Sequence, residues 1–416
     1  MIKILTFSTL FPSNAQPGHG IFVETRLRHL LQSGNVSARV VAPVPWFPFG
    51  HGSFGRYAAF ARVAGDEARG GLRIVHPRYP VLPKVGMTVA PALLALAAKP
   101  ALERIIREGH DFDLIDAHYF YPDGVAAALL GRALGKPVVI TARGTDLTLV
   151  PRHRLPRRMI QWAAGRAAGL VTVCQALKDV LVGLDVAPAR IEVMRNGVDL
   201  NLFRPLEPAA QRALGRARLG LAGRTLLSVG LLIPRKGHDL AIRALALLPG
   251  VTLLIAGNGP EEAGLRALAK DCGVGGRVRF LGALSQPELR EHYGAADALV
   301  LASSREGWAN VLLEAMACGT PVIASDVGGT AEVVASPAAG VLMIERTPAA
   351  LADAARRLFA HYPAAGLTRL YAERFSWDDT TNAQLALFER IVGERGARPA
   401  APGARREAAA FADGRE

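Results

Sequence analysis

The sequence predicts an α/β protein with two Rossmann-like, doubly wound parallel-sheet domains that face each other across a cleft. The chain has 416 residues, well above the usual single-domain size of about 150. Short continuous apolar runs alternate with helical stretches, as expected for parallel strands covered by helices on both faces. The alternation pauses near residues 196–208 and then starts again. Two successive sheets are therefore the simplest interpretation.

The first predicted domain spans residues 1–200. Its strands are expected at five apolar runs, namely Ile2–Phe7, Ala38–Ala42, Leu114–Ala117, Val138–Thr141 and Leu170–Val173. Helices are expected between them, for example at Ile21–Gln32 and Val125–Leu134. The N-terminal run is interpreted as the first buried strand rather than as a signal peptide, because Pro12 and Asn14 follow it closely.

The second predicted domain spans residues 201–375 and repeats the pattern. Its strands are expected at Thr225–Gly230, Val251–Ala256, Val278–Leu281, Ala298–Ala302 and Pro321–Ser325. Ser376 then caps a last helix, predicted to end at residue 392, and we expect the segment 376–392 to pack back on the first domain. The tail at 393–416 has no hydrophobic periodicity and is expected to be disordered.

The composition excludes several classes of protein. The chain is 50% hydrophobic and 20% charged, with 43 Gly and 27 Pro, which excludes wholesale disorder and collagen-like repeats. Its three cysteines lie far apart without a CxxC pair, so we predict neither a zinc site nor a disulfide framework, and a reducing cytosol fits. The most apolar later run, Val85 to Ala98, is too short to span a bilayer.

Positive charge is concentrated in the first half of the chain. The formal net charge is +13; residues 1–200 hold 24 basic and 14 acidic side chains (+10), and residues 201–416 hold 25 and 22 (+3). Such a field favours an anionic partner: nucleic acid, a membrane surface or a phosphorylated substrate.

Ligands of open parallel sheets bind beyond the carboxyl ends of the strands. After the strand at Thr225–Gly230, Arg235 and Lys236 open a helix, so two cations and a helix N-terminus could hold an anion. A solvated pair is the alternative. In the next loop, Gly257 lets the backbone approach a ligand closely, but the third glycine of GxGxxG is missing, and a plain turn is equally compatible.

The loop and helix after the strand at Ala298–Ala302 hold the strongest candidate site. Glu306 and Gly307 lie in the loop, Asn310 begins a helix, and Glu314 lies inside its otherwise apolar stretch. A carboxylate there must be paired or hydrogen-bonded. Two such acceptors suit the hydroxyls of a sugar and a ribose, while nearby amides suit a phosphate. The alternative is a surface acid and a helix-dipole acid. A further glycine-rich loop carries Gly328 and Gly329.

Three loops of the first domain are also candidates. Gly18 and Gly20 precede a helix and could cradle an anion, or form a flexible turn. His118 ends a strand, where a ligand role and a structural role are equally compatible, and Arg143 and Asp146 follow the next strand. The pair Asp111 and Asp113 precedes its strand, at the wrong edge for a ligand, so we predict no metal there.

These residues together resemble the retaining glycosyltransferases of family 4, which have the two-Rossmann GT-B architecture. The resemblance covers roughly residues 1–392 and is carried by Glu306–Gly307, Glu314–Ala317, Gly319, Pro321, Ala324–Gly329, Glu332, Arg235–Gly237, Asn196–Asp199 and Phe203. It departs from the family pattern at Leu231, where an arginine is common and for which Arg235 could substitute, and at Arg143, where many relatives have histidine.

The resemblance implies roles for these residues. A nucleotide-sugar donor would bind mainly the second domain, with Glu306 at the transferred sugar, Glu314 at the ribose and Lys236 at the diphosphate. Amides near Gly328 would assist Lys236, and His118 would meet the sugar from the first domain, which also receives the acceptor. The resemblance further implies retention of configuration without a metal or other cofactor.

A basic segment suggests where the acceptor lies. Leu147 to Leu177 contains no acidic residue but five arginines, with apolar residues between them: Arg152, Arg154, Arg157, Arg158 and Arg166, with Met159, Ile160 and Trp162. This mixture suits an anionic membrane surface; nucleic acid or a solvated face are alternatives, although no nucleic-acid motif accompanies it. We therefore expect a cytoplasmic protein on the inner face of the plasma membrane, acting on a glycan or polyprenyl-linked acceptor in cell-envelope polysaccharide biosynthesis.

Two other functions remain open from the sequence. One is a nucleotide-sugar epimerase of the same shape, and the other is a non-catalytic membrane-associated partner of another transferase. The intact Glu306, Glu314 and Lys236 argue against the second. A nicotinamide dehydrogenase is disfavoured because no GxGxxG follows the first strand.

Overall fold

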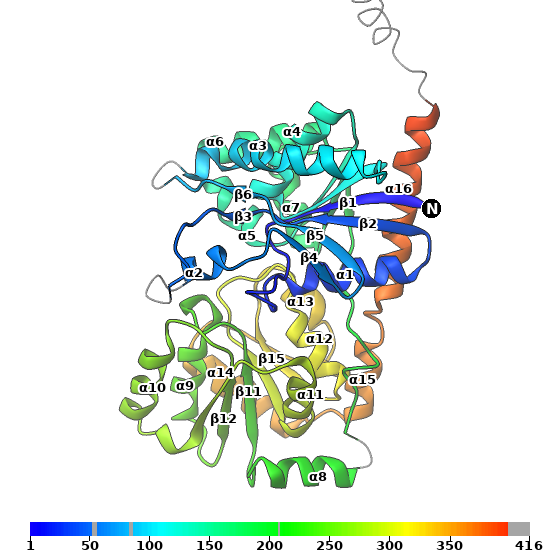
Figure 1. Ribbon diagram of the computed structural model, residues 1–416. Coiled ribbons are helices and arrows are strands. Elements are labelled where there is room, and N and C mark those ends of the chain that lie inside the picture. The colour runs from blue at the N-terminus through cyan, green and yellow to red at the C-terminus, as the bar shows by residue number, and fades with distance from the viewer. Residues whose placement is uncertain (52–55, 83–85, 207–208, 398–416) are drawn as a thin grey trace, which may run out of the picture.

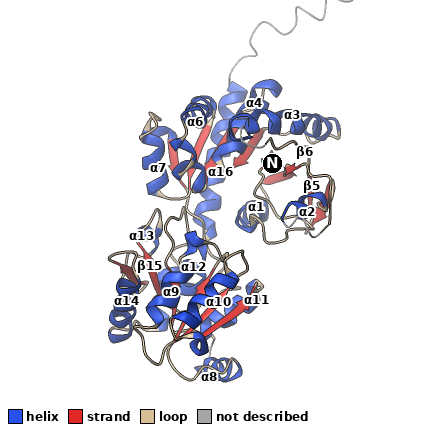
Figure 2. Ribbon diagram, turned by 90° about the vertical axis from the view of Figure 1, so that its left-hand side faces the viewer, coloured by secondary structure: helices blue, strands red, loops and turns tan. Residues whose placement is uncertain are grey.

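Two parallel sheets, one in each half of the chain, organise the structure into an upper and a lower lobe (Figure 1). The computed structural model describes residues 1–51, 56–82, 86–206 and 209–397. Within these ranges, no helix combines the length and the apolar character that crossing a bilayer requires. Helices cover both faces of each sheet (Figure 2).

The first lobe contains an eight-stranded sheet in the order β10-β9-β8-β7-β1-β2-β5-β4. Its strands are β1 (Ile2–Phe7), β2 (Val36–Val41), β4 (Asp66–Arg69), β5 (Leu72–Val75), β7 (Leu114–His118), β8 (Val138–Ala142), β9 (Gly169–Thr172) and β10 (Ile191–Val193). All neighbours are parallel except β4 and β5, which form an antiparallel edge hairpin. A separate ribbon pairs β3 (Val44–Pro45) with β6 (Arg78–Tyr79).

The helices of the first lobe lie in two layers. They are α1 (Ile21–Gln32), α2 (Arg56–Ala61), α3 (Gly86–Arg107), α4 (Val125–Leu134), α5 (Thr145–Thr148), α6 (Arg154–Arg166) and α7 (Gln175–Val182), with short helical turns at Phe120–Gly124, Val150–Arg152 and Pro188–Arg190. Adjacent residues of β1 face opposite layers: Leu5 packs in the core with α3 and α4, and Ile4 in the core with α1. This two-sided burial explains the continuous apolar runs.

The second lobe contains a six-stranded, all-parallel sheet in the order β13-β12-β11-β14-β15-β16. Its strands are β11 (Thr225–Val229), β12 (Thr252–Ala256), β13 (Val278–Gly282), β14 (Ala298–Leu301), β15 (Val322–Ser325) and β16 (Gly340–Met343). Its helices are α8 (Ala209–Arg218), α9 (His238–Leu245), α10 (Glu262–Asp271), α11 (Gln286–Ala295), α12 (Asn310–Ala317), α13 (Thr330–Val333), α14 (Pro348–Ala360) and α15 (Ala365–Ala372), with short helical turns at Pro234–Lys236 and Gly275–Arg277.

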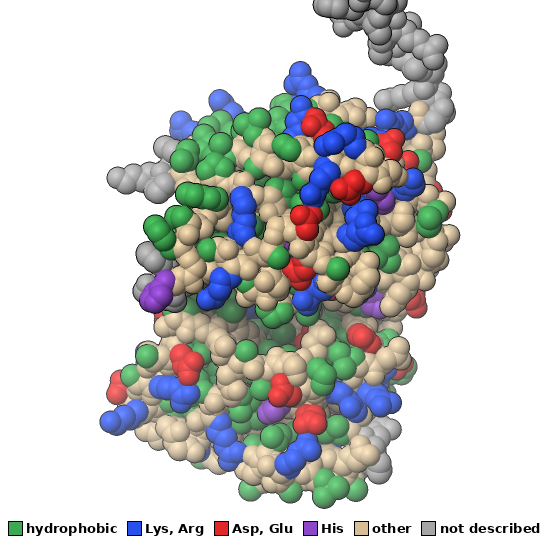
Figure 3. All heavy atoms as spheres, viewed as in Figure 1, with side chains coloured by type: hydrophobic (Ala, Val, Ile, Leu, Met, Phe, Trp, Pro, Cys, Tyr) green, Lys and Arg blue, Asp and Glu red, His purple; other side chains and the backbone are tan. Residues whose placement is uncertain are grey.

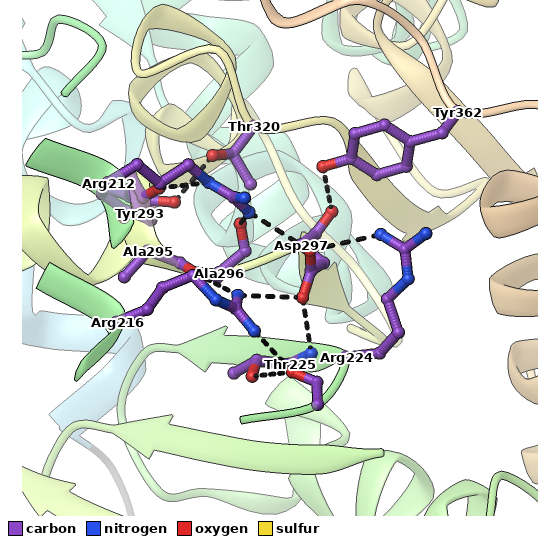
Figure 4. A network of polar contacts seen from close by, with 12 residues as sticks. Arg212, Arg216, Arg224, Thr225, Tyr293, Ala295, Ala296, Asp297, Thr320 and Tyr362 are labelled. Carbon is purple, nitrogen blue, oxygen red and sulfur yellow. Dashed lines mark hydrogen bonds and ion pairs between the residues drawn. The ribbon is translucent and has the colours of Figure 1, made fainter. Parts of the chain in front are cut away.

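An arginine cluster closes the lower sheet at the edge opposite the cleft. Asp297 precedes β14, and its carboxylate lies 3.1 Å from both Arg212 and Arg216 and 3.3 Å from Arg224 (Figure 4). The same carboxylate accepts the backbone N–H of Thr225 at 2.8 Å. One buried acid thereby ties α8 to the starts of β11 and β14.

The chain crosses between the lobes twice, and the two crossings touch. The first crossing includes Gly197 and Val198, and the second includes Phe375 and Trp377. The backbone N–H of Val198 donates to the carbonyl of Phe375 at 3.0 Å. A Cβ atom on Gly197 would lie 2.5 Å from the backbone nitrogen of Trp377, so only glycine permits this approach.

The last helix, α16 (Trp377–Ala397), returns to the first lobe and lies along α1. It buries Leu387 and Phe388 in the same core as β1 and β2. The helix runs past residue 392, where the sequence placed its end, because one glycine at 393 costs only about 1 kcal/mol in a helix that packing already holds. Residues 393–397 of the expected disordered tail are therefore helical, and the rest of that tail, 398–416, lies outside the described residues.

Phe388→Ala should detach α16 from its core. The side chain is fully buried, so its removal should lower the free energy of unfolding by about 3–5 kcal/mol through the cavity that it leaves. The neighbouring exposed Glu389→Ala should change it by less than about 0.5 kcal/mol. Guanidinium titrations followed by circular dichroism would measure both, and equal effects would show that α16 is not docked in solution.

Candidate active site

A cleft of about 990 Å³ lies between the two lobes, and the carboxyl ends of both sheets supply its walls. Figure 3 shows it as the hollow band between the upper and lower lobes. The residues that line it include Gly18, Gly20, Tyr119, Arg143, Thr148, Leu231, Arg235, Lys236, Gly257, Glu306, Gly307 and Asn310. Most of the candidate residues from loops distant in sequence therefore meet in one place, as the parallel-sheet rule predicts.

In the lower wall, a carboxylate holds two cations. Lys236 Nζ lies 2.7 Å from Glu306 Oε1, and Arg235 Nη1 lies 3.3 Å from Oε2. The hydroxyl of Ser303 also donates to Oε1 at 2.7 Å. Burial alone would raise the pKa of Glu306, but the charge and hydrogen bond of Lys236, with Arg235 and Ser303, outweigh it and lower that pKa. The carboxylate is thus ionised and both cations stay at the cleft.

Leu231 also lines the cleft, at the position where the family commonly has arginine. Its side chain is exposed. The guanidinium of Arg235 lies on the same carboxylate as Lys236 and donates to the carbonyl of Arg305 at 3.0 Å. Two cations therefore occur in this wall, although one of the family's usual positions is apolar.

The glycines of the lower wall mainly allow loops to pack on one another. A Cβ atom on Gly328, whose φ is +55°, would lie 1.9 Å from the carbonyl oxygen of Glu306. The backbone N–H of Gly329 donates to the carbonyl of Gly307 at 3.2 Å. A Cβ on Gly307 would in turn lie 2.0 Å from the carbonyl oxygen of Arg143, so the lobes meet here. Gly328 and Gly329 accordingly support the loop of Glu306 from behind, and neither is among the residues that line the cleft.

Glu314 lies one turn beyond Asn310 on α12, behind the cleft lining. The hydroxyl of Tyr293 donates to Glu314 Oε2 at 2.9 Å, which confirms that a carboxylate in this apolar stretch needs a hydrogen bond. Burial raises the pKa of Glu314 to about 7 despite that bond. Near neutral pH the side chain is therefore poised between acid and carboxylate. Nothing in the sequence pattern pointed to Tyr293.

In the upper wall, the helix α1 begins at Gly20 with no side-chain cap. Gly20 has φ +68°, and a Cβ atom there would lie 2.3 Å from the backbone of Leu10. Asp146 is fully buried and does not face the cleft: its carboxylate accepts the backbone N–H groups of Phe120 and Gly144, each at 2.6 Å. Asp146 thus shapes the loop that carries Arg143 instead of contacting a ligand.

His118 is buried behind Arg143, with both ring nitrogens bonded. Arg143 Nη2 lies 2.6 Å from Nδ1, and Asp116 Oδ2 lies 3.0 Å from Nε2. Since a guanidinium only donates, Nδ1 must accept and Nε2 must carry the proton. Burial and the charge of Arg143 lower the pKa of His118 to about 4, against the opposing effect of Asp116. The structure thus brings Arg143, rather than His118, to the cleft wall.

This chain of hydrogen bonds continues to α16. Asp116 Oδ2 also accepts from Gln384 Nε2 at 3.1 Å, and Gln384 Oε1 accepts from Arg26 Nε at 2.7 Å. Arg143 Nη1 donates to Asn196 Oδ1 at 3.0 Å, at the crossing between lobes. Asp116 and His118 share one face of β7 because they are two residues apart, a signal that sequence analysis could have used. Gln384 gave no such signal.

The remaining candidates lie outside the cleft. Arg154, Arg157 and Arg158 are exposed at the start of α6, and Arg152 is exposed in the helical turn before it. Trp162 is half-buried, and the guanidinium of Arg166 lies 4.5 Å from the centre of its ring. Asp111 pairs with Lys136, and Asp113 accepts the backbone N–H of Lys3, both at the far edge of the sheet. Across the part of the chain that the structure describes, no three His, Cys, Asp or Glu side chains gather as metal ligands would.

Comparisons with known proteins agree with this architecture. Residues 61–202 match the family model for Glycosyltransferase Family 4, and residues 217–367 match that for Glycosyl transferases group 1. D-inositol 3-phosphate glycosyltransferase of Mycobacterium leprae (strain Br4923) is 38% identical over 327 residues, which are 73% of this chain and 74% of that protein. The Mycobacterium tuberculosis (strain H37Ra) protein of that name is 34% identical over 73% and 66%.

Solved structures share the fold. Sucrose-phosphate synthase from Thermosynechococcus elongatus superposes with a TM-score of 0.74 at 20% identity, covering 95% of this chain and 100% of that one. Anabaena HepE in complex with UDP gives a TM-score of 0.69 at 22% identity, covering 93% and 98%.

The geometry predicts the protonation state of His118. Its ring should be neutral with the proton on Nε2 at pH 7, because Arg143 occupies Nδ1. Removing that cation in Arg143→Leu should raise the pKa of His118, since the charge of Arg143 lowers it in the unaltered chain. Nitrogen-15 chemical shifts of the ring would report both effects, with Arg243→Leu on the other lobe as the control. A ring that titrates near pH 6.5 in the unaltered chain would contradict the arrangement.

Proposed function

The chain belongs to glycosyltransferase family 4, and from this membership we propose that it transfers a sugar from a nucleotide-sugar donor with retention of configuration. The observation that carries the proposal is the pair of cations at Glu306 in the cleft. A glycosyltransferase with a GT-B fold needs a positive site for the leaving diphosphate and an acceptor group for the sugar hydroxyls. Arg235, Lys236 and Glu306 supply both kinds of group side by side.

Donor binding would exchange partners at this carboxylate. Without a ligand, Lys236 and Arg235 share the single negative charge of Glu306, which leaves the group with one net positive charge. A diphosphate carries more negative charge than one carboxylate and would draw both cations toward it. Glu306 would then be free to accept a hydroxyl of the transferred sugar. The cations and the carboxylate that pair with one another in the empty site would thus make separate contacts with the donor.

The chemical step can proceed with these residues alone. The bond between the anomeric carbon and the phosphate oxygen breaks, and the diphosphate leaves with the electron pair. The acceptor oxygen bonds to that carbon on the same face, and its proton passes to the departing phosphate oxygen. Lys236 and Arg235 stabilise the charge that develops on the leaving group, and the two walls of the cleft hold the acceptor oxygen beside the departing phosphate, on the same face of the sugar. We propose that no metal or other cofactor takes part.

For the acceptor, we propose a glycan or polyprenyl-linked molecule of cell-envelope polysaccharide biosynthesis, bound by the upper wall. The uncapped start of α1 and Arg143 support an anionic or phosphate-bearing group there. A phosphorylated polyol is a second candidate, because the relatives at 38% identity are named for D-inositol 3-phosphate. Assays with each acceptor class, after thermal-shift screening of UDP-, GDP- and ADP-sugars, would separate them.

We further propose that the protein acts in the cytoplasm, attached to the anionic inner face of the plasma membrane. The exposed arginines at the start of α6 and in the helical turn before it support this location: Arg152, Arg154, Arg157 and Arg158. Basic side chains are attracted electrostatically to anionic lipid head groups when they lie within about one Debye length of the membrane surface.

Lys236→Ala and Glu306→Ala should each reduce kcat/KM for transfer at least about a hundredfold, because each removes a contact with the developing charge or the reacting sugar. Lys270→Ala is a matched control, since Lys270 is the other lysine of residues 201–416 and is exposed on α10. Circular dichroism would verify that all three variants fold. Near-normal turnover in either site variant would overturn the proposed function.

Donor affinity should depend on the ionisation of Glu314. If its carboxylate accepts the ribose hydroxyls, binding requires loss of the proton that burial retains up to pH about 7. Nucleotide-sugar affinity should then be about tenfold weaker at pH 6 than at pH 8. Calorimetric titrations would measure it, with Glu314→Gln expected to bind weakly and without this dependence. An identical pH profile in both proteins would exclude Glu314 as the ribose acceptor.

A further inference from the structure

We infer that one face of the first lobe, built from the β3–β6 ribbon, the outer side of α3 and the start of α6, inserts apolar side chains into an anionic phospholipid bilayer. The inference rests on the proposed membrane attachment and names the surface that makes it. We call this surface the apolar-basic face, defined by Trp46, Val81, Leu82, Met87, Leu96, Leu155, Arg154 and Arg158.

The face begins at the ribbon. The backbone N–H of Trp46 donates to the carbonyl of Tyr79 at 2.7 Å, which places Trp46 beside the segment that continues to Val81 and Leu82. The side chains of Trp46, Val81 and Leu82 are 56%, 52% and 44% exposed. A large aromatic ring and two aliphatic side chains at one end of a ribbon, all open to solvent, are unusual on a protein surface without a partner.

The outer side of α3 continues it. From Met87 to Ala98 the helix carries no charged residue, and its exposed positions include Met87 and Leu96, the latter 70% exposed. An apolar helix that is buried on one side and exposed on the other is expected where a membrane or another apolar surface covers its exposed side. In Figure 3 the hydrophobic side chains gather at the upper left, over α3 and β6.

Tyr121 joins α3 to α6. Its hydroxyl bonds the carbonyl of Met87 at the start of α3 and lies 3.9 Å from the sulfur of Met159 on α6. Leu155, on the first turn of α6, is exposed, and Arg154 and Arg158 are exposed beside it. Figure 2, which looks onto the left-hand side of Figure 1, shows α6 at the left of the upper lobe and α3 and β6 at its right, and α3 contacts both of the other elements.

Charge selects a bilayer as the occupant of this face. The stretches of sequence that carry the residues of this face, 44–46, 78–82, 86–98 and 154–158, contain no Asp or Glu. Apolar side chains flanked by arginines, with no carboxylate in these stretches, match an anionic lipid surface: the apolar groups enter the acyl boundary while the long arginine side chains reach the phosphates. In this arrangement the excess positive charge of the first half of the chain lies toward the anionic membrane.

Short chain segments link the cleft to the apolar-basic face. Tyr119 and Thr148 line the cleft. Tyr121, whose hydroxyl bonds the carbonyl of Met87, follows Tyr119 by two residues, and Arg154 of the face follows Thr148 by six. A lipid-anchored acceptor in the bilayer could therefore enter the cleft while the protein stays bound.

Co-sedimentation of the full chain with vesicles would test the inference. One vesicle contains phosphatidylcholine alone, and the other contains equimolar phosphatidylcholine and phosphatidylglycerol. The apolar variant is Met87→Gln with Leu96→Gln, and the basic variant is Arg154→Gln with Arg158→Gln. The controls are Leu214→Gln and Arg243→Gln, which are exposed positions of the second lobe.

The unaltered chain and both controls should bind the anionic vesicles at about 0.15 M salt. The apolar variant should bind at least about tenfold more weakly. If Trp46 enters the bilayer, the tryptophan emission of the unaltered chain should shift to shorter wavelength on vesicle binding, and the apolar variant should lose this shift. The basic variant should also bind more weakly, and its residual binding should depend less on salt. Binding that is equal in all variants, or absent for the unaltered chain, would overturn the inference.

Two further measurements separate this inference from the others. If a second copy covers the face, light scattering should show a dimer that the apolar variant dissociates, and that result would overturn the bilayer as the occupant. Donor hydrolysis and transfer to a soluble acceptor report on the proposed function without vesicles. Loss of vesicle binding with intact soluble transfer would refute only the inference, and vesicle binding without any transfer would refute only the proposed function.

Discussion

The ion pair between Lys236 and Glu306 is the interaction on which the chemistry of the cleft depends. Burial alone would raise the pKa of the Glu306 carboxyl, and the charge and hydrogen bond of Lys236, with Arg235, lower it. The carboxylate therefore stays ionised in a site that water only partly reaches. The glycines at 307, 328 and 329 serve the same pair, because they let the loops behind Glu306 and in front of it approach without side chains between them. The acid is therefore held by backbone packing as well as by charge.

The upper wall follows a different principle, in which a buried chain of hydrogen bonds fixes one cation. Arg143 is held by His118 and Asn196, and Asp116 holds His118. Gln384 on α16 completes the arrangement. The family resemblance implies that His118 meets the sugar, and many relatives have histidine where this chain has Arg143. Because residue 143 is arginine, His118 supports it from behind, and Arg143 lines the wall of the cleft.

Sequence analysis reached the strands of both parallel sheets that are continuous apolar runs, because burial on two faces leaves a signal in every residue of the run. It missed β3, β4, β5, β6, β10 and β16, none of which is longer than four residues, and β4 reads Asp-Glu-Ala-Arg without any apolar run. Residue type and position after a strand can be read directly from the sequence, and these features identified Glu306, Lys236 and Asn310 as candidates. The partners of Glu314 and His118, and the supporting task of Gly328, depend on contacts across long sequence distances, which no local pattern contains.

The contact between the two crossings has a mechanical consequence. Val198 is bonded to Phe375 where the chain passes between the lobes in each direction, and Gly197 lies against Trp377 so closely that a side chain at position 197 would not fit between the segments. Because the two crossing segments are bonded to each other at one point, they resist translation of one lobe relative to the other. Rotation about that point is then the motion of the lobes that costs least. The cleft would then open and close by rotation about one hinge, and its width would change most on the side farthest from α16.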